Sequence, residues 1–412
     1  MKLGDKSIKP EEKLTRLYPQ KNLFSHIVGQ IDDDNIGISG LEKTLDRKLK
    51  ETNKPIQLTV DEDIQYLIRK ELIKFNNIFD ANGSAAILMN VNNGEILSLV
   101  SLPDFDLNQR QKIEDINFIN RATKGVYELG SVFKTFTLAA ALNEKIVETN
   151  TEFVDLEKSI RCGGNTISEY DLKIPSNLTA EEILIRSGNI GSVRIGQKLG
   201  LEKFMEYMNK FDLMSQMNFD IEEMGVPLKL RWGKCKLATA SFGHGITTTP
   251  IQLAKAYSIV SNGGYEIHPT LIKKDKNEIK KRILDQEVSF KINNILRKIV
   301  TTKEGTASLA NVNGYEVGGK TGTAQKIING NYSNKKINTF ASIFPISNPK
   351  FTLVVMLDEP KTNKDYIYTY RDGSGKYKGT PFNTAGWTSV EIVGQIIDKI
   401  GPILATKYIE VD

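Results

Sequence analysis

The chain has few of the residues that build metal centres or disulfide frameworks. Its 412 residues include three histidines and two cysteines, without an H-x-x-x-H pair or a C-x-x-C motif. A zinc site is therefore not expected. Cys162 and Cys235 lie 73 residues apart, which is not the spacing of a disulfide framework, and we expect two buried or idle thiols.

Long apolar runs are lacking as well. The longest span about seven residues, at 136–142 and 351–357, whereas a membrane helix needs 18 or more. The first ten residues are polar, so no signal peptide is visible. Taken alone, these features predict a soluble protein, unless an anchor has been removed from the chain.

No charge of one sign dominates. Lysine and arginine number 55 against 50 acidic residues, a net charge of +5. This excess is too small to indicate nucleic-acid binding and fits mild attraction to an anionic surface or polymer. With 32 glycines and 13 prolines the composition also excludes collagen and low-complexity disorder.

Strand patterns gather near both ends of the sequence, and helical patterns fill the middle from about 112 to 300. Asn93-Gly94 and Asn329-Gly330 are hairpin signals. The predicted strands are 56–60, 84–91, 95–101, 316–328, 337–345 and 351–358. The predicted helices begin after Asp61, near Ser131, after Thr179 (with a capping box to Glu182), at Pro250 and after Thr388. This order predicts an α+β fold with a central antiparallel sheet, flanked by helices, that joins the two ends of the chain. Residues 1–54 are predicted to be an extended appendage and 55–412 the main domain.

A lysine inside an apolar helix is the first candidate for chemistry. Lys134 is the only charged residue in a segment that is apolar on nearly every side, and Ser131 lies three positions earlier on the same face. Burial disfavours the ammonium form of lysine, and a neutral amine can remove a proton from a hydroxyl. A serine N-cap beside a lysine that extends to the surface is the alternative.

Two further motifs are weak when taken alone. Ser187-Gly188-Asn189 falls at a helix break, which either positions a hydroxyl and an amide together or simply ends a helix. Lys320-Thr321-Gly322-Thr323 begins a strand after two glycines. It offers a cation and hydroxyls to a carboxylate lying along a sheet edge, or is only a glycine-rich strand start.

The segment 314–321 also matches G-x-x-x-x-G-K-[ST], the phosphate-binding loop of nucleotide triphosphatases. That loop needs a strand before it and a helix directly after Lys-Thr. Here the preceding residues form a poor strand pattern, and Gly322 opens an alternating segment. The sequence therefore disfavours an ATPase. No G-x-S-x-G motif or defensible carboxylate pair is present, which disfavours an α/β-hydrolase or a glycosidase.

Together, S-x-x-K, S-x-N and K-T-G in this order resemble the signature of penicillin-binding proteins and β-lactamases. Residues 127–134, 241–254, 317–324, 384–387 and 401–404 resemble the cell-division branch of the class B penicillin-binding proteins. The resemblance covers about 30–412 and implies a penicillin-binding/β-lactamase-like transpeptidase domain at 55–412. Residues 1–54 would then be the remnant of an N-terminal non-catalytic (pedestal) region.

The resemblance also implies roles for the motif residues. Ser131 would attack the bond between the last two D-alanines of a peptidoglycan stem peptide, Lys134 would accept its proton and Ser187 would relay a proton to the leaving amine. The substrate-binding residues would be Asn189, Lys320, Thr321, Gly322 and Thr323, and the backbone N–H groups of Ser131 and Thr323 would form the oxyanion hole. No metal or organic cofactor is implied.

The implied partners are stem peptides, both the D-Ala-D-Ala donor and the amine acceptor, β-lactam antibiotics, and membrane division proteins such as the septal glycosyltransferase FtsW; nucleic acid is not among them. The implied location is the periplasmic side of the bacterial inner membrane, with an N-terminal anchoring helix that this chain lacks.

The sequence departs from the family pattern at two positions. The family usually has proline at the position of Leu129, and at the position of Gly188 it often has a serine or, in β-lactamases, an aspartate. A D,D-carboxypeptidase, a β-lactamase and a non-catalytic β-lactam sensor or scaffold stay open as alternatives.

Overall fold

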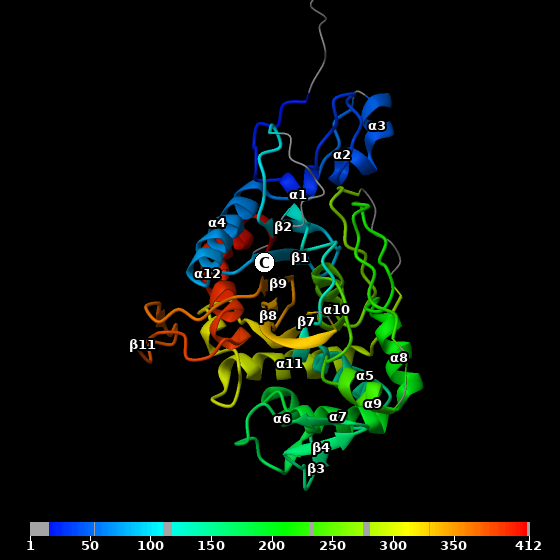
Figure 1. Ribbon diagram of the computed structural model, residues 1–412, viewed down its shortest axis with the longest axis vertical. Coiled ribbons are helices and arrows are strands. Elements are labelled where there is room, and N and C mark those ends of the chain that lie inside the picture. Colours follow the sequence, from blue (N-terminus) through cyan, green and yellow to red (C-terminus); the bar gives the residue numbers. More distant parts are fainter. Residues whose placement is uncertain are drawn as a thin grey trace, which may run out of the picture.

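Five antiparallel strands from both ends of the chain form the central sheet of this computed structural model (Figure 1). The structure describes residues 16–52, 54–109, 118–230, 232, 234–274, 281–328 and 330–409. The strand order is β2-β1-β9-β8-β7. The strands are β1 (Gly83–Asn90), β2 (Ile96–Leu102), β7 (Gly318–Ile328), β8 (Asn331–Phe344) and β9 (Phe351–Asp358).

Pairing between β1 and β9 joins the two ends of the chain, with Ile87 opposite Val354. All eight residues of β9 are buried, because helices cover both faces of the sheet (Figure 1). α4 (Glu62–Ile78) and α12 (Ser389–Tyr408) pack on one face, and α10 (Pro250–Ser261) and α11 (Gln286–Thr301) pack on the other. The predicted α+β fold with a central antiparallel sheet is confirmed.

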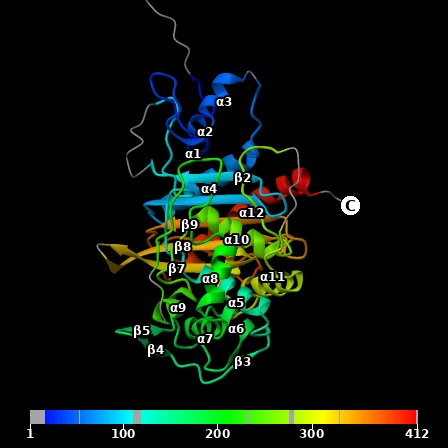
Figure 2. The same ribbon diagram turned by 90° about the vertical axis from the view of Figure 1, so that its right-hand side faces the viewer.

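A second helical region lies beyond β7, at the bottom of Figure 2. It consists of η2 (Gly130–Phe133), α5 (Lys134–Asn143), α6 (Ala180–Ile185), α7 (Asn189–Leu199), α8 (Leu201–Lys210) and α9 (Lys234–Ala240). Two small strand pairs project from it: β3 (Glu152–Phe153) with β6 (Leu178–Thr179), and β4 (Ser159–Cys162) with β5 (Asn165–Ser168). The predicted capping box joins Thr179 and Glu182 at the start of α6. The active-site cavity described below lies between this region and β7.

The remaining elements are short. They are α1 (Ser25–Val28), α2 (Gly40–Thr44), α3 (Asp46–Glu51), η3 (Ser308–Ala310), β10 (Ile367–Thr369), β11 (Lys376–Lys378) and η4 (Ala385–Trp387). Within the described residues, no helix is both long enough and apolar enough to cross a membrane.

Two local predictions were wrong. The strand predicted at 56–60 is absent, because only Leu58 forms a bridge, to Ile272, before the chain turns into α4. The described part of 1–54 is not extended: it holds α1, α2 and α3, and Ile27 and Leu41 join the hydrophobic core. The helix predicted to begin near Ser131 is confirmed: its first turn is the 3-10 helix η2, which continues directly into α5. The boundary between residues 54 and 55 stays a prediction.

Candidate active site

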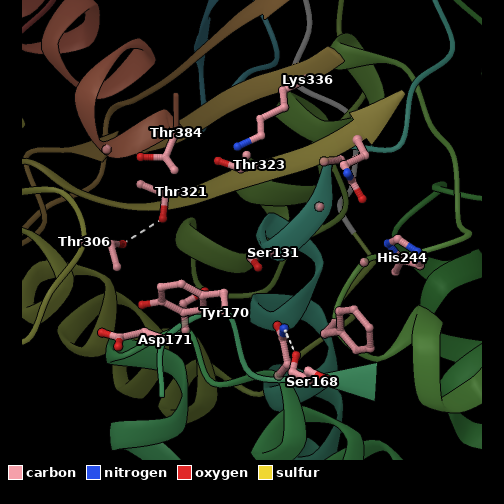
Figure 3. Close-up of a pocket in the computed structure, with 18 of the residues that line it drawn as sticks. Ser131, Ser168, Tyr170, Asp171, His244, Thr306, Thr321, Thr323, Lys336 and Thr384 are labelled. Carbon is pink, nitrogen blue, oxygen red and sulfur yellow. Dashed lines mark hydrogen bonds between the residues drawn. The ribbon is translucent and has the colours of Figure 1, made fainter. Parts of the chain in front are cut away.

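A cavity of about 1470 Å³ opens between β7 and the helical region (Figure 3). Five of the eight predicted site residues line it: Ser131, Ser187, Asn189, Thr321 and Thr323. Lys134 and Lys320 lie behind its wall, with 2% and 0% of their surface exposed. Gly322 lies between the two threonines, buried in β7. The structure therefore brings together residues from three segments that are far apart in the sequence.

The backbone of Ser131 lies against the edge strand of the sheet. Gly130 has a φ of +68° and approaches Thr323 so closely that a Cβ on it would lie 2.8 Å from the Thr323 carbonyl oxygen. A Cβ on Gly322 would lie 2.1 Å from the carbonyl oxygen of Leu129. Glycine is needed at both positions, because any side chain would push η2 away from β7.

The Lys134 ammonium is held by acceptors on the loop between α6 and α7. Its Nζ donates to the Ser187 carbonyl, to Ser187 Oγ at 3.3 Å and to Asn189 Oδ1 at 2.7 Å. Burial lowers the pKa of Lys134 from 10.5 to about 7, and the Glu169 carboxylate opposes that shift. The Ser131 hydroxyl, which is half-buried, forms no hydrogen bond with any described residue. Lys134 is therefore able to lose a proton near neutral pH, three residues along the chain from a serine with an uncommitted hydroxyl.

Ser187 connects the two buried lysines. Lys320 Nζ donates to Ser187 Oγ at 2.8 Å and to the Thr321 carbonyl at 3.1 Å. Burial and the nearby Lys134 hold the pKa of Lys320 well below its usual value. Ser187 has a φ of +57°, the left-handed region that a serine rarely adopts. Such backbone strain clusters at functional sites, where it orients a side chain.

The hydroxyls on β7 are fixed by neighbouring segments. Thr321 Oγ1 lies 2.7 Å from Thr306 Oγ1 (Figure 3). Thr323 Oγ1 accepts a hydrogen bond from the backbone N–H of Ala385 at 3.0 Å. These hydroxyls make this side of the cavity polar, and the two lysines lie buried directly behind it. Such a wall suits a ligand that carries a carboxylate.

After Thr321 the chain continues as β7, paired with β8, where a phosphate-binding loop would need a helix. The strand at this position agrees with the prediction that residues 314–321 are not the phosphate-binding loop of an ATPase.

Sequence reasoning missed an aromatic wall on the side of the cavity that Figure 3 labels with His244. The His244 ring stacks on Tyr332 at 4.4 Å between centroids and on Phe242 at 5.8 Å. The buried Glu128 lies behind it, and its Oε1 accepts from the Tyr332 hydroxyl at 3.3 Å. Phe242 and His244 lie two residues apart, but no local sequence signal joins them to Glu128 and Tyr332, which come from distant segments.

Sequence reasoning also missed Glu169, whose carboxylate accepts hydrogen bonds from the backbone of α7. The prediction of two idle thiols was wrong, because Cys162 and Cys235 form a disulfide. It joins the β4–β5 hairpin to α9. The sequence separation hid the pairing, since the fold alone brings these two positions within disulfide distance.

The comparisons with known proteins agree with this geometry. A profile described as the penicillin binding protein transpeptidase domain matches residues 84–380. A probable peptidoglycan D,D-transpeptidase FtsI of Caulobacter vibrioides is 31% identical over 98% of this chain and 69% of its own length. Stage V sporulation protein D of Bacillus subtilis is 32% identical, over 98% of this chain and 66% of its own length. The chain thus spans about two thirds of the length of these relatives.

Among solved structures, penicillin binding protein 3 of Mycobacterium tuberculosis superposes with a TM-score of 0.80, covering 97% of this chain and 92% of its own at 24% identity. This similarity supports the fold, and the sequence relatives and the matched domain support the family. The chain is a member of the penicillin-binding protein transpeptidase family, of the class B type that includes FtsI and penicillin-binding protein 3.

Proposed function

We propose that the protein is a serine D,D-transpeptidase that cross-links peptidoglycan stem peptides through an acyl-enzyme on Ser131. The observation that carries the proposal is the contact of both buried lysines, Lys134 and Lys320, with the hydroxyl of Ser187 beside the Ser131 cavity. Few structural roles require two desolvated lysines on one hydroxyl, because burying each charge is costly.

In the acylation step, neutral Lys134 accepts the proton of the Ser131 hydroxyl as Oγ attacks the carbonyl carbon of the penultimate D-alanine. The oxyanion that forms is stabilised by the backbone N–H groups of Ser131 and Thr323. The bond to the terminal D-alanine then breaks. Ser187 passes a proton, held by Lys134, to the departing amine nitrogen. The products are the Ser131 ester and free D-alanine.

Lys320, Thr321 and Thr323 bind the terminal carboxylate of the donor, and Gly322, between the two threonines, lets η2 and Ser131 pack closely on this stretch of β7. Asn189 binds the donor peptide and holds Lys134. In the second step an amine from a neighbouring stem peptide attacks the ester and loses a proton, and the proton returns to Ser131 Oγ. No metal or organic cofactor takes part in either step.

β-Lactams would acylate the same serine, because they present a strained amide with a carboxylate at the matching place. Penicillin binding protein 3 of Mycobacterium tuberculosis has been solved in complex with aztreonam and with ampicillin. These complexes support β-lactam binding by a protein of this fold.

We place the activity in septal wall synthesis at cell division, on the periplasmic side of the inner membrane, with membrane division proteins such as FtsW as partners. The support is the name of two relatives: FtsI of Caulobacter vibrioides, and FtsI of Escherichia coli, which is 28% identical over 97% of this chain and 69% of its own length. Stage V sporulation protein D, at a similar identity, makes a sporulation role the competing assignment.

Labelling with a fluorescent penicillin, followed over hours on a denaturing gel, tests the proposal. A stable covalent label on the wild-type protein is expected. Rapid loss of label would instead indicate a β-lactamase, and no label at all would indicate a non-catalytic scaffold. Supplying a donor stem peptide with and without an amine acceptor then separates transfer from D,D-carboxypeptidase activity.

A further inference from the structure

The helix that carries Asn189 begins without a cap of its own. The N-cap residue of α7 is Gly188, which has no side chain to accept from the first turn. The first N–H groups of a helix have no partner inside the helix, and an uncapped N-terminus is less well fixed. Asn189, which binds Lys134, is the first residue of this helix. Holding Asn189 in place therefore needs a hydrogen-bond acceptor from outside the helix.

Glu169, at the end of the β4–β5 hairpin, supplies that acceptor. Its Oε2 accepts from the backbone N–H of Asn189 at 2.7 Å, and its Oε1 accepts from the backbone N–H of Ile190 at 2.8 Å. A carboxylate at a helix N-terminus forms charge-assisted hydrogen bonds and interacts favourably with the helix dipole. One side chain, 20 residues away in the sequence, thus holds the first turn of α7.

The same hairpin holds the Asn189 side chain. Asn189 Nδ2 donates to the Ser168 carbonyl at 2.8 Å, and its Oδ1 accepts from Lys134 Nζ at 2.7 Å. Ser168 is labelled on the cavity wall below Ser131 in Figure 3. The disulfide Cys162–Cys235 fixes the hairpin to α9. A continuous set of contacts therefore runs from the hairpin through Asn189 to the lysine.

We propose that Glu169 is a positioning residue for acylation, which fixes α7 so that Asn189 holds Lys134 beside Ser131. This inference rests on the proposed function of that site. Glu169 also acts on Lys134 through its charge. Among the described residues, the charged groups that face Lys134 are Lys320 on β7 and Glu169 at the end of β5, and Glu169 raises the pKa of Lys134 against the effect of burial.

The test substitutes Glu169→Gln, which keeps the shape of the side chain and removes its charge. We expect the plateau of the acylation rate with a penicillin to fall about tenfold, the scale of weakened charge-assisted contacts. We also expect the midpoint of the pH profile of acylation to move to lower pH, because Lys134 loses a nearby negative charge.

The control is Glu182→Gln, in the capping box of the neighbouring α6. It removes a helix-capping carboxylate that does not contact Lys134, so the plateau rate and the pH midpoint should both stay near wild type.

A second-site variant separates positioning from general damage. Gly188 has a φ of −61°, and a Cβ on it would meet nothing closer than Glu169 Oε1 at 3.6 Å. An aspartate therefore fits there and can cap α7 itself. In the Glu169→Gln background, Gly188→Asp should restore the plateau to within about threefold of wild type and return the midpoint toward it. A Glu169→Gln rate and midpoint equal to wild type would overturn the proposal, and so would a loss that Gly188→Asp leaves unchanged.

An NMR titration keeps this test independent of activity. In protein labelled with ¹³C-lysine, the Lys134 signal is assigned by its loss in Lys134→Arg. The pH midpoint of the titration of this signal should be lower in Glu169→Gln than in wild type. If penicillin never labels the protein yet this shift occurs, the proposed function fails while the link from Glu169 to Lys134 stands. If labelling is normal and the midpoint does not move, the link fails alone.

Discussion

Lys320 Nζ lies 2.8 Å from Ser187 Oγ, although 133 residues separate the two in the sequence. The contact joins the edge strand β7 to the strained loop between α6 and α7. It makes Ser187 the common acceptor of both buried lysines, because Lys134 Nζ lies 3.3 Å from the same oxygen. In this arrangement a proton can move between the two sides of the cavity through a single hydroxyl.

Lys320→Ala should lower the second-order rate of acylation by a penicillin roughly 10²-fold or more, because a desolvated charge-assisted contact to the ligand carboxylate is lost. Stopped-flow measurement of acylation gives this rate. Lys335→Ala is the matched control, since Lys335 lies on the neighbouring strand β8 with 55% of its side chain exposed. Equal rates for Lys320→Ala and wild type would mean that the lysine only supports the strand.

Lys134→Arg should be about as inactive in acylation as Lys134→Ala. Arginine keeps the charge but does not deprotonate in a protein, so it cannot accept the Ser131 proton. For the wild type, the rate should rise with pH and level off above about 7, because Lys134 is neutral above that pKa. Circular dichroism checks that the variants fold. Near wild-type acylation by Lys134→Arg would show that the base lies elsewhere.

The buried lysines also predict how stability depends on pH. The pKa of Lys134 is about 7 in the folded protein and about 10.4 in the unfolded chain, and that of Lys320 is also lowered. Between these values the unfolded chain binds more protons, so the free energy of unfolding rises with pH. Urea unfolding at pH 7 and 9 should show a smaller increase for Lys134→Met than for wild type. An equal increase in the free energy of unfolding of both proteins would contradict a lowered pKa for Lys134.

Reducing the Cys162–Cys235 disulfide should destabilise the protein, because the bond closes a loop over a sequence separation of 73 residues. Loss of a bond of this kind costs about 2–4 kcal/mol. Thermal unfolding with and without reductant measures the loss, and the double variant Cys162→Ser, Cys235→Ser should be insensitive to reductant. A wild-type melting temperature that reductant leaves unchanged would contradict the pairing.

The sheet and five of the helices (α4, α5, α6, α10 and α12) could be predicted from sequence because their signals are local. Alternation of apolar residues, the capping box at Thr179 and the turn at Asn93-Gly94 each act within a few positions. The three motifs could be recognised because their residues are close in sequence. Glu169, the aromatic wall at His244 and the disulfide could not be found this way. Each depends on contacts between distant segments, and the sequence around each residue carries no signal of its partner.

The same limit explains the local errors. Residues 56–60 alternate like a strand, but they do not join the sheet, whose edge strand is β2, and only Leu58 forms a bridge, to Ile272. The α1–α3 segment has little periodicity of its own. Its helices are fixed by contacts elsewhere, such as the bond from Gly40 N to Glu223 Oε1 at 2.8 Å. Tertiary contacts, which no local pattern reports, decide the outcome in both cases.

The identity of the acylated residue tests the account most directly. Intact mass spectrometry after treatment with a β-lactam should show one adduct per protein molecule, and peptide mapping should place it on Ser131. Ser131→Ala should carry no adduct while keeping the wild-type circular dichroism spectrum. An adduct that persists on Ser131→Ala, or that maps to a different residue in the wild type, would contradict the central claim that Ser131 is the nucleophile.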